Sequence, residues 1–110
     1  EATKHESGIY YIIQDEGTGE TYPDINSEVE VRYKGYFIDG DIFDQTQDSS
    51  TFTYELSYLI SGWQHGIPLI KRGGKETLFI PSALGYGEDD YYTIPGNSVL
   101  IFEIELVDFQ

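Results

Sequence analysis

Cysteine and histidine, the residues of thiolate and zinc chemistry, are absent or rare in this 110-residue chain. There are no cysteines, so thiolate catalysis, disulfides and cysteine-bound metals are excluded. The only histidines are His5, in a polar N-terminal stretch, and His65, which we expect on the exposed side of a short helix. A catalytic triad or a zinc site needs several such groups in one place, so neither is predicted.

Two other motifs could bind ions, but they lack the required spacing. Asp39, Asp41 and Asp44 offer carboxylate oxygens, yet they straddle an expected hairpin and do not follow the pattern of a calcium loop. The stretch EGTGE (residues 16–20) has two glycines, no third at the spacing of a dinucleotide-binding loop, and acidic flanks that repel phosphate. We interpret these residues as turn and surface residues, and we predict no metal site and no cofactor.

The residues that stand out are aromatic, and they centre on LISGWQHGIPL (residues 59–69), which holds the only tryptophan. Ile60, Trp63 and Ile67 fall at i, i+3 and i+7, which predicts one face of a helix. Ser61 is the expected N-cap, and Pro68 limits the helix to about two turns.

Two glycines flank the tryptophan four positions apart, at Gly62 and Gly66. They leave a strip without side chains, along which the helix could approach a sheet closely. A single large indole on such a short helix is either a core residue or the floor of a binding site, and the local pattern alone leaves both open.

Charge and composition narrow the class of protein. Six basic residues stand against twenty acidic ones, a net charge of −14, so binding to nucleic acid or to an anionic membrane is not expected. No apolar run approaches the roughly 18 residues of a membrane-spanning helix. The aromatic share of 15% is typical of a folded domain.

The rest of the chain shows strand patterns around that one helix. In EVEVRYKGYFIDG (residues 28–40), Val29, Val31 and Tyr33 alternate with charged residues, and Asp39-Gly40 predicts a hairpin turn with positive φ at both positions. GIYYIIQ (8–14), TFTYEL (51–56), KETLFIP (75–81) and SVLIFEIELVDF (98–109) are further strands. The predicted fold class is α+β, with one antiparallel sheet curved around one short helix. Residues 1–7 are expected to form a tail or linker, and residues 8–110 one domain.

Four ordered blocks of this sequence resemble the FKBP-type peptidyl-prolyl cis-trans isomerases. They are VEVRYKGYFIDGDIFD (29–44), LISGWQHGI (59–67), LFIPSALGYG (78–87) and IPGNSVLIFEIELVDF (94–109), and the likeness extends over about residues 8–109. The resemblance implies a five- to six-stranded antiparallel sheet around a short helix. It also implies an enzyme that accelerates rotation about Xaa-Pro bonds, without a cofactor, in a shallow apolar cleft.

The resemblance further implies roles for individual residues. Trp63 would be the floor under the proline ring, Tyr86 would donate its hydroxyl to a substrate carbonyl, and Leu59 would offer its backbone. Asp44 would be the polar group of the cleft wall. The implied catalytic residues are Tyr33, Phe43, Asp44, Trp63, Tyr86 and Phe102, and the implied substrate-binding residues are Phe52, Leu59, Ile60 and Ile94. For Phe43 and Phe102, core packing is an equally good interpretation.

The residues expected at the rim of the cleft depart from the family pattern. The loop of residues 45–50 lacks the arginine that often pairs with the aspartate, so we expect other donors to orient Asp44. Tyr58 stands at a position that is often acidic, and residues 88–93 read EDDYYT. Two other functions therefore stay open. One is a proline-peptide-binding or chaperone module with little isomerase activity, and the other is a glycan-binding surface at Tyr91 and Tyr92.

Partners and location follow from the same resemblance. The expected partners are proline-containing polypeptides, with tacrolimus-like macrolides as further candidate ligands. The lead-in SGIYYIIQDEGTGE (7–20) resembles the bacterial exported branch, which predicts a periplasmic protein or an envelope lipoprotein and leaves a cytoplasmic one open. Because the chain begins with Glu1 and contains no methionine, we expect it to be the trimmed part of a longer protein.

Overall fold

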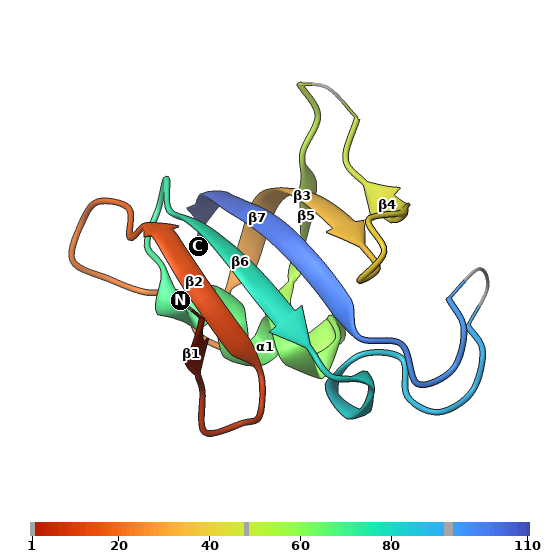
Figure 1. The fold of residues 1–110 in the computed structure, drawn as a ribbon. Coiled ribbons are helices and arrows are strands. Elements are labelled where there is room, and N and C mark those ends of the chain that lie inside the picture. Colours follow the sequence, from red (N-terminus) through yellow and green to blue (C-terminus); the bar gives the residue numbers. More distant parts are fainter. Residues whose placement is uncertain (1, 48, 92–93) are drawn as a thin grey trace.

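The computed structural model describes residues 2–47, 49–91 and 94–110. One antiparallel sheet curves around one short α-helix, which confirms the predicted fold class (Figure 1). In these ranges the sheet order is β1-β2-β6-β7-β3-β4, and β5 also pairs with β3. The strands are β1 Thr3–Lys4, β2 Tyr10–Asp15, β3 Glu28–Tyr36, β4 Ile42–Gln45, β5 Phe52–Glu55, β6 Lys75–Ile80 and β7 Leu100–Phe109.

The count of seven strands exceeds the expected five or six because the N-terminal stretch adds one at the edge. Thr3 pairs with Tyr11 and Lys4 with Tyr10. The His5 ring lies 5.8 Å from the His65 ring, centroid to centroid, and its Nδ1 is 2.8 Å from Ser7 Oγ. The stretch expected to be a tail therefore contacts the domain in residues 3–7.

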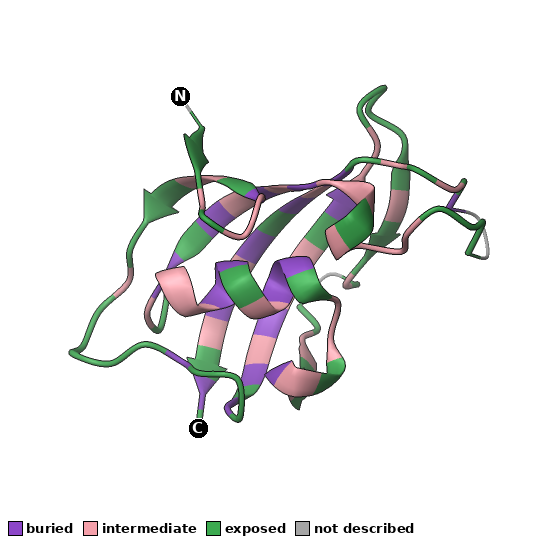
Figure 2. Ribbon diagram, turned by 90° about the horizontal axis from the view of Figure 1, so that it is seen from below, coloured by how far each residue is buried: buried purple, intermediate pink, exposed green. Residues whose placement is uncertain are grey.

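The strands follow the predicted alternation and bury one face against the helix. Val29 and Val31 of β3 are fully buried, as are Leu100 and Leu106 of β7. Purple buried bands on the central strands lie behind the helix in Figure 2. Burying these branched side chains provides about 1.5–3 kcal/mol each, which makes this layer the main stabilising contact of the domain.

The helix α1, Ser61–Gly66, lies across that face and carries Trp63. Within the described ranges, three 3₁₀ helices flank the sheet and α1: η1 Leu56–Tyr58, η2 Ile67–Leu69 and η3 Ser82–Leu84. The prediction that Ser61 caps α1 is wrong, because Ile60 occupies the N-cap position and no side chain bonds the first turn. The α-helix ends at Gly66, close to Pro68, but Ile67 keeps right-handed helical backbone angles and the chain continues into η2.

The two glycines of α1 allow the close approach to the sheet that the sequence indicated. A Cβ atom on Gly62 would lie 2.4 Å from Ile80 Cδ1, and one on Gly66 would lie 2.4 Å from Leu78 Cδ1. The helix backbone therefore rests directly on β6. This contact sets the position of α1 on the sheet and with it the position of Trp63.

We expect Gly62→Ala to destabilise the domain by about 1–3 kcal/mol, because an added methyl group overpacks the contact with Ile80. The gain in helix propensity of up to about 1 kcal/mol only partly offsets this cost. Urea unfolding followed by tryptophan fluorescence measures the difference. Ser61→Ala, on the exposed first residue of α1, is the matched control and should stay within about 0.5 kcal/mol of the parent. A Gly62→Ala variant as stable as this control would contradict the close approach.

The hairpin between β3 and β4 turns at the predicted place, but its geometry differs from the prediction. Gly40 has φ +96°, whereas Asp39 is not among the positive-φ residues of the described chain. The loop is closed by Phe37 N–H donating to Asp41 O and Gly40 N–H donating to Phe37 O, each at 2.9 Å. In the described ranges, no helix has both the length and the apolar character needed to cross a membrane.

Candidate active site

A hollow of about 200 Å³ opens above the tryptophan, between α1 and the end of the sheet that carries β4 and β5. Eight residues line it, and all of them were implied by the family resemblance. We call this set the hollow: Tyr33, Asp44, Phe52, Leu59, Ile60, Trp63, Tyr86 and Phe102. Apart from Asp44, its side chains are aromatic or aliphatic, so it suits an apolar ring better than a charged group.

Trp63 forms the base of the hollow and is held by other aromatic rings. Its ring centroid lies 5.1 Å from Tyr33, 5.2 Å from Phe102 and 6.5 Å from Phe52, all in edge-to-face geometry. The side chain is 5% exposed, and its indole N–H has no hydrogen-bond partner among the described residues. Packing rather than a polar anchor therefore orients the ring, and the hollow remains open above it.

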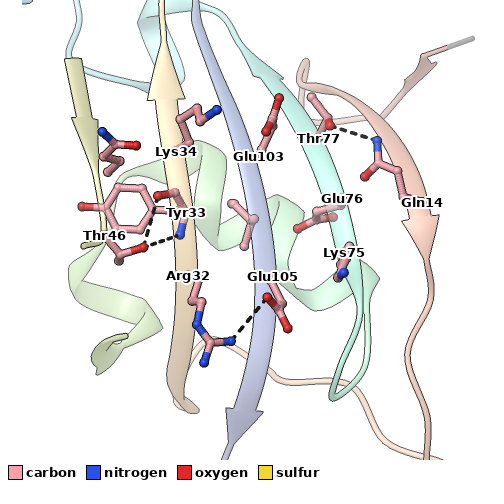
Figure 3. Close-up of a pocket in the computed structure, with 12 residues that line it drawn as sticks. Gln14, Arg32, Tyr33, Lys34, Thr46, Lys75, Glu76, Thr77, Glu103 and Glu105 are labelled. Carbon is pink, nitrogen blue, oxygen red and sulfur yellow. Dashed lines mark hydrogen bonds and ion pairs between the residues drawn. The ribbon is translucent and has the colours of Figure 1, made fainter. Parts of the chain in front are cut away.

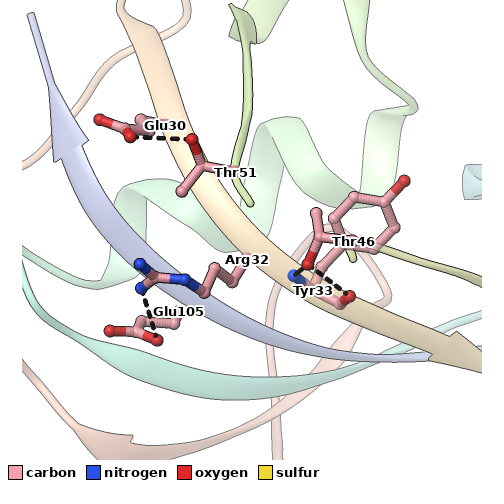
Figure 4. Close-up of polar contacts among 6 residues, drawn as sticks. All are labelled: Glu30, Arg32, Tyr33, Thr46, Thr51 and Glu105. Atoms are coloured by element: carbon pink, nitrogen blue, oxygen red, sulfur yellow. Dashed lines mark hydrogen bonds and ion pairs between the residues drawn. The ribbon is translucent and has the colours of Figure 1, made fainter. Parts of the chain in front are cut away.

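The single carboxylate of the hollow is oriented by a neighbour in the same site. Tyr33 donates its hydroxyl to Asp44 Oδ2 at 2.7 Å and thus orients the carboxylate, while residues 45–50 contain no arginine. Burial, and next the hydrogen bond to Asp44, raise the pKa of the Tyr33 hydroxyl, which therefore stays protonated. Thr46 Oγ1 accepts from Tyr33 N–H at 3.2 Å, which ties β3 to the segment after β4 (Figure 4).

Tyr86 enters the hollow from the loop after η3, between two glycines. Gly87 has φ +81°, a conformation that a residue with a side chain rarely adopts. The Tyr86 ring stacks on Tyr91 at 4.5 Å with an interplanar angle of 10°. Burial, followed by the nearby Tyr91 and Asp44, raises the pKa of the Tyr86 hydroxyl, which keeps it a hydrogen-bond donor at neutral pH.

The backbone groups of Leu59, implied to contact the ligand, already have partners within the domain. Leu59 N–H donates to Leu56 O at 3.0 Å, and Leu59 O accepts from Gln64 Nε2 at 2.9 Å. The free backbone donor among the hollow residues of this segment is the N–H of Ile60, because it has no partner in the described chain. Gln64 also donates to Ser57 O at 3.1 Å. It therefore positions the rim, a role that no feature of the sequence indicated.

Two of the implied site residues do not line the hollow. Phe43 packs edge-to-face on Phe102 at 5.5 Å and lies 4.9 Å from Phe37, so it supports the wall from behind. Ile94 is 7% exposed and exchanges two backbone hydrogen bonds of 2.8 Å with Tyr91. Core packing thus accounts for Phe43, and Ile94 braces the loop that carries Tyr91.

A larger cavity of about 530 Å³ lies on the opposite face of the sheet, and we call it the outer groove. Figure 3 shows its side chains in front of the strands, with the helix behind. Across the strands Lys34 pairs with Glu103, and Arg32 pairs with Glu105 at 3.4 Å. Such alternating cross-strand charges stabilise a solvated sheet face. The outer groove is therefore lined mainly by charged and polar side chains, whereas the hollow is lined mainly by aromatic and aliphatic ones.

The geometry gives little support to the metal-binding and glycan-binding sites that the sequence analysis considered. Among the described residues, no three His, Asp or Glu side chains gather where they could hold a metal ion. Tyr91, one half of the expected glycan-binding pair, has a face covered by Tyr86. The other half, Tyr92, lies outside the described residues.

Comparison with known protein families agrees with this arrangement. A family model described as FKBP-type peptidyl-prolyl cis-trans isomerase matches residues 19–107. The FKBP-type isomerase FkpA of Buchnera aphidicola (subsp. Schizaphis graminum) is 45% identical over 109 residues, which are 98% of this chain and 43% of that protein. FkpA of Escherichia coli K12 is 40% identical over 105 residues, 94% of this chain and 38% of that protein. The chain thus spans about two fifths of the length of these relatives.

Solved structures of FKBP-type proteins have the same fold as this chain. The crystal structure of FkpA from Escherichia coli superposes with a TM-score of 0.94 at 37% identity, covering 99% of this chain and 51% of that one. A peptidyl-prolyl cis-trans isomerase from Pseudomonas syringae pv. tomato gives 0.88 at 37% identity, covering 99% and 80% of the two chains. The similarity therefore extends over the whole described fold.

Proposed function

The chain belongs to the FKBP-type peptidyl-prolyl cis-trans isomerases, and we propose that its hollow is where Xaa-Pro bonds of polypeptides rotate. The observation that carries this proposal is the open apolar hollow over Trp63 with Tyr86 and Asp44 at its wall. Folding assistance is the corresponding role, because slow Xaa-Pro rotation limits the folding of many chains.

The chemistry requires little from the side chains. Rotation about an Xaa-Pro bond breaks amide resonance, with a barrier of about 18–20 kcal/mol, but it makes and breaks no covalent bond. A site that fits the twisted amide better than either planar form therefore suffices. The twisted amide is less dipolar than the planar one, so an apolar, water-poor surface favours it relative to the ground state.

Each residue of the hollow then has a defined task. The proline ring would rest on the Trp63 indole, between the rings of Phe52 and Phe102. The Tyr86 hydroxyl and the Ile60 N–H would donate to carbonyl oxygens of the bound segment and hold it while the bond turns. The Asp44 carboxylate, held by Tyr33, would lie at the wall of the hollow beside the rotating bond.

The direct test is NMR exchange spectroscopy on a proline peptide with the domain present at catalytic concentration. We expect the cis/trans exchange rate to rise above that of the free peptide, and Tyr86→Phe to lower kcat/KM about 3–10-fold through loss of one hydrogen bond worth about 0.5–1.5 kcal/mol. Because the raised pKa keeps Tyr86 protonated, its contribution should not change between pH 6 and 9. Tyr10→Phe, on an exposed tyrosine of β2, is the matched control and should match the parent.

The same exchange measurement distinguishes an isomerase from the alternative, a binding or chaperone module. A domain that binds proline peptides without raising the exchange rate would be a binding or chaperone module of the same fold. The observation that favours this alternative is the altered rim, whose loop at residues 45–50 contains no arginine. Tacrolimus-like macrolides remain candidate ligands for the same hollow.

We further propose an exported protein, because the stretch before residue 20 resembles the exported bacterial branch. The sequence encoded upstream of Glu1 tests this proposal directly, since it would have to include a signal peptide.

A further inference from the structure

We propose that an aromatic ladder next to the hollow binds a lysine or arginine side chain of the substrate, in the segment that flanks the proline. The ladder consists of Phe52, Tyr54 and Tyr58. Phe52 is part of the hollow, and its ring stacks on Tyr54 at 5.7 Å with an interplanar angle of 15°. Tyr54 in turn meets Tyr58 edge-to-face at 6.0 Å. This inference rests on the proposed function, because it extends the same site.

The topology of the sheet places the ladder on the same side as the hollow. Tyr54 pairs with Val29 and Phe52 with Val31, and both valines face the helix. Residues directly opposite each other in an antiparallel pair share a face, so the rings of β5 also lie on the helix side. Tyr58 follows in η1, at the entry to α1. The ladder therefore continues the hollow along the edge of the sheet.

The exposure of these rings has no explanation within the domain. Tyr54 is 50% exposed and Tyr58 is 73% exposed, and neither hydroxyl has a hydrogen-bond partner in the described chain. A contiguous exposed aromatic surface beside an apolar hollow is typical of a binding site rather than of ordinary surface. The faces of tyrosine rings attract ammonium and guanidinium groups through their negative π-electron density.

The distribution of charge favours a cation over an apolar or acidic side chain. Residues 35–70 and 76–110, which supply every hollow residue except Tyr33, contain no lysine or arginine and twelve acidic residues, of which Glu76, Glu103 and Glu105 line the outer groove. The cations of β3 and β6, Arg32, Lys34 and Lys75, line the outer groove on the opposite face (Figure 3). The hollow and ladder therefore lie away from these cations on a strongly acidic domain, which attracts cationic segments and repels acidic ones.

The ring spacings set the register of the substrate. The distance between ring centroids is 6.5 Å from Trp63 to Phe52 and a further 5.7 Å from Phe52 to Tyr54. An extended chain advances roughly 3.3 Å per residue, so the ladder lies about two to four residues from the bound proline. Peptides with one lysine three residues before or three residues after the proline therefore probe it on either flank.

The experiment compares such lysine peptides with matched norleucine and glutamate peptides, by Trp63 fluorescence titration and by NMR exchange rates at low salt. We expect lysine peptides to bind about three- to tenfold more tightly than norleucine peptides, glutamate peptides to bind most weakly, and 0.5 M salt to reduce these ratios. The variant Tyr54→Leu/Tyr58→Leu should bring the lysine-to-norleucine ratio close to one. Tyr10→Leu, on an exposed tyrosine of β2, is the matched control and should keep the parent ratio.

Equal binding of lysine and norleucine peptides by the parent would overturn the proposal, as would the absence of peptide binding altogether. A lysine preference that survives in the double variant would also overturn it, since the general negative field and not the ladder would then cause it. A lysine preference that disappears in the double variant, together with unaccelerated exchange, would support the ladder and refute the isomerase function.

Discussion

Replacing Trp63 with leucine is expected to lower kcat/KM for proline isomerisation at least tenfold while the domain remains folded. The indole is the base of the hollow and contacts three further aromatic rings that shape its walls. Leucine keeps the position apolar but removes the flat surface beneath the proline ring. A tenfold loss corresponds to about 1.4 kcal/mol of transition-state stabilisation, a small part of what a stacked ring and a closed apolar base can supply.

The choice of leucine separates activity from stability. Truncating a buried aromatic residue to alanine costs about 3–5 kcal/mol, which is a large share of the 5–15 kcal/mol that a domain has. Circular dichroism and urea unfolding report on the fold, and NMR exchange spectroscopy of a proline peptide reports on the rate.

Phe109→Leu is the matched control for the Trp63 variant. Phe109 is 8% exposed, stacks under the Arg72 guanidinium, and lies outside the hollow. This control should lose stability and keep its activity per folded molecule. If Trp63→Leu isomerises the peptide as fast as Phe109→Leu does, the indole is only a core residue.

The helix-side architecture could be predicted from sequence because it follows from periodicity. Alternation in β3 placed Val29 and Val31 on one face, and each is fully buried. The pattern at Trp63, together with the glycines, gave the helix and its contact with the sheet. These features depend on residues close in sequence, whose side-chain directions are fixed by strand and helix geometry.

Contacts between distant segments could not be predicted in the same way. The donor to Asp44 is Tyr33, eleven residues earlier, and only the register of β3 with β4 brings them together. Ser61 has a good N-cap side chain, but the chain enters the helix one residue earlier, so Ile60 takes that position. Phe43 and Phe102 both come from apolar strand positions, and periodicity cannot say which ring reaches the hollow and which supports it.

Glu76 occupies a position of β6 where the alternation predicts an apolar core residue. Glu76 shares the phase of Leu78 and Ile80 on β6 and is 1% exposed, facing the core. Its cross-strand partners are Ile13 and Ile104, and neither carboxyl oxygen has a hydrogen-bond partner among the described residues. Burial raises the pKa of this carboxyl well above its usual 4.5. The group is therefore held in the core at a cost that grows as it ionises.

Replacing Glu76 with leucine is accordingly expected to stabilise the domain by about 1–3 kcal/mol at pH 8, by removing an unsatisfied buried polar group. The native state holds the proton more tightly than the unfolded state, so the stability linked to Glu76 is fully present below pH 4.5. This stability is lost as pH rises towards the native-state pKa. The free-energy difference between variant and parent should therefore widen above pH 4.5, by up to about 1.4 kcal/mol per pH unit.

Urea unfolding of both proteins from pH 4 to pH 9 measures this difference, and the comparison cancels the titration of the other acidic residues. Glu20→Gln, which removes an exposed carboxylate, is the matched control and should give a difference that stays small at every pH. Glu76→Gln keeps the shape and the polarity but cannot ionise, so it should remove the pH dependence without the full gain at low pH. A difference that is the same at pH 4 and pH 9 would mean that the Glu76 carboxylate reaches water or a cation. The core of the sheet would then be more open beside β6 than the packing of Leu78 and Ile104 implies.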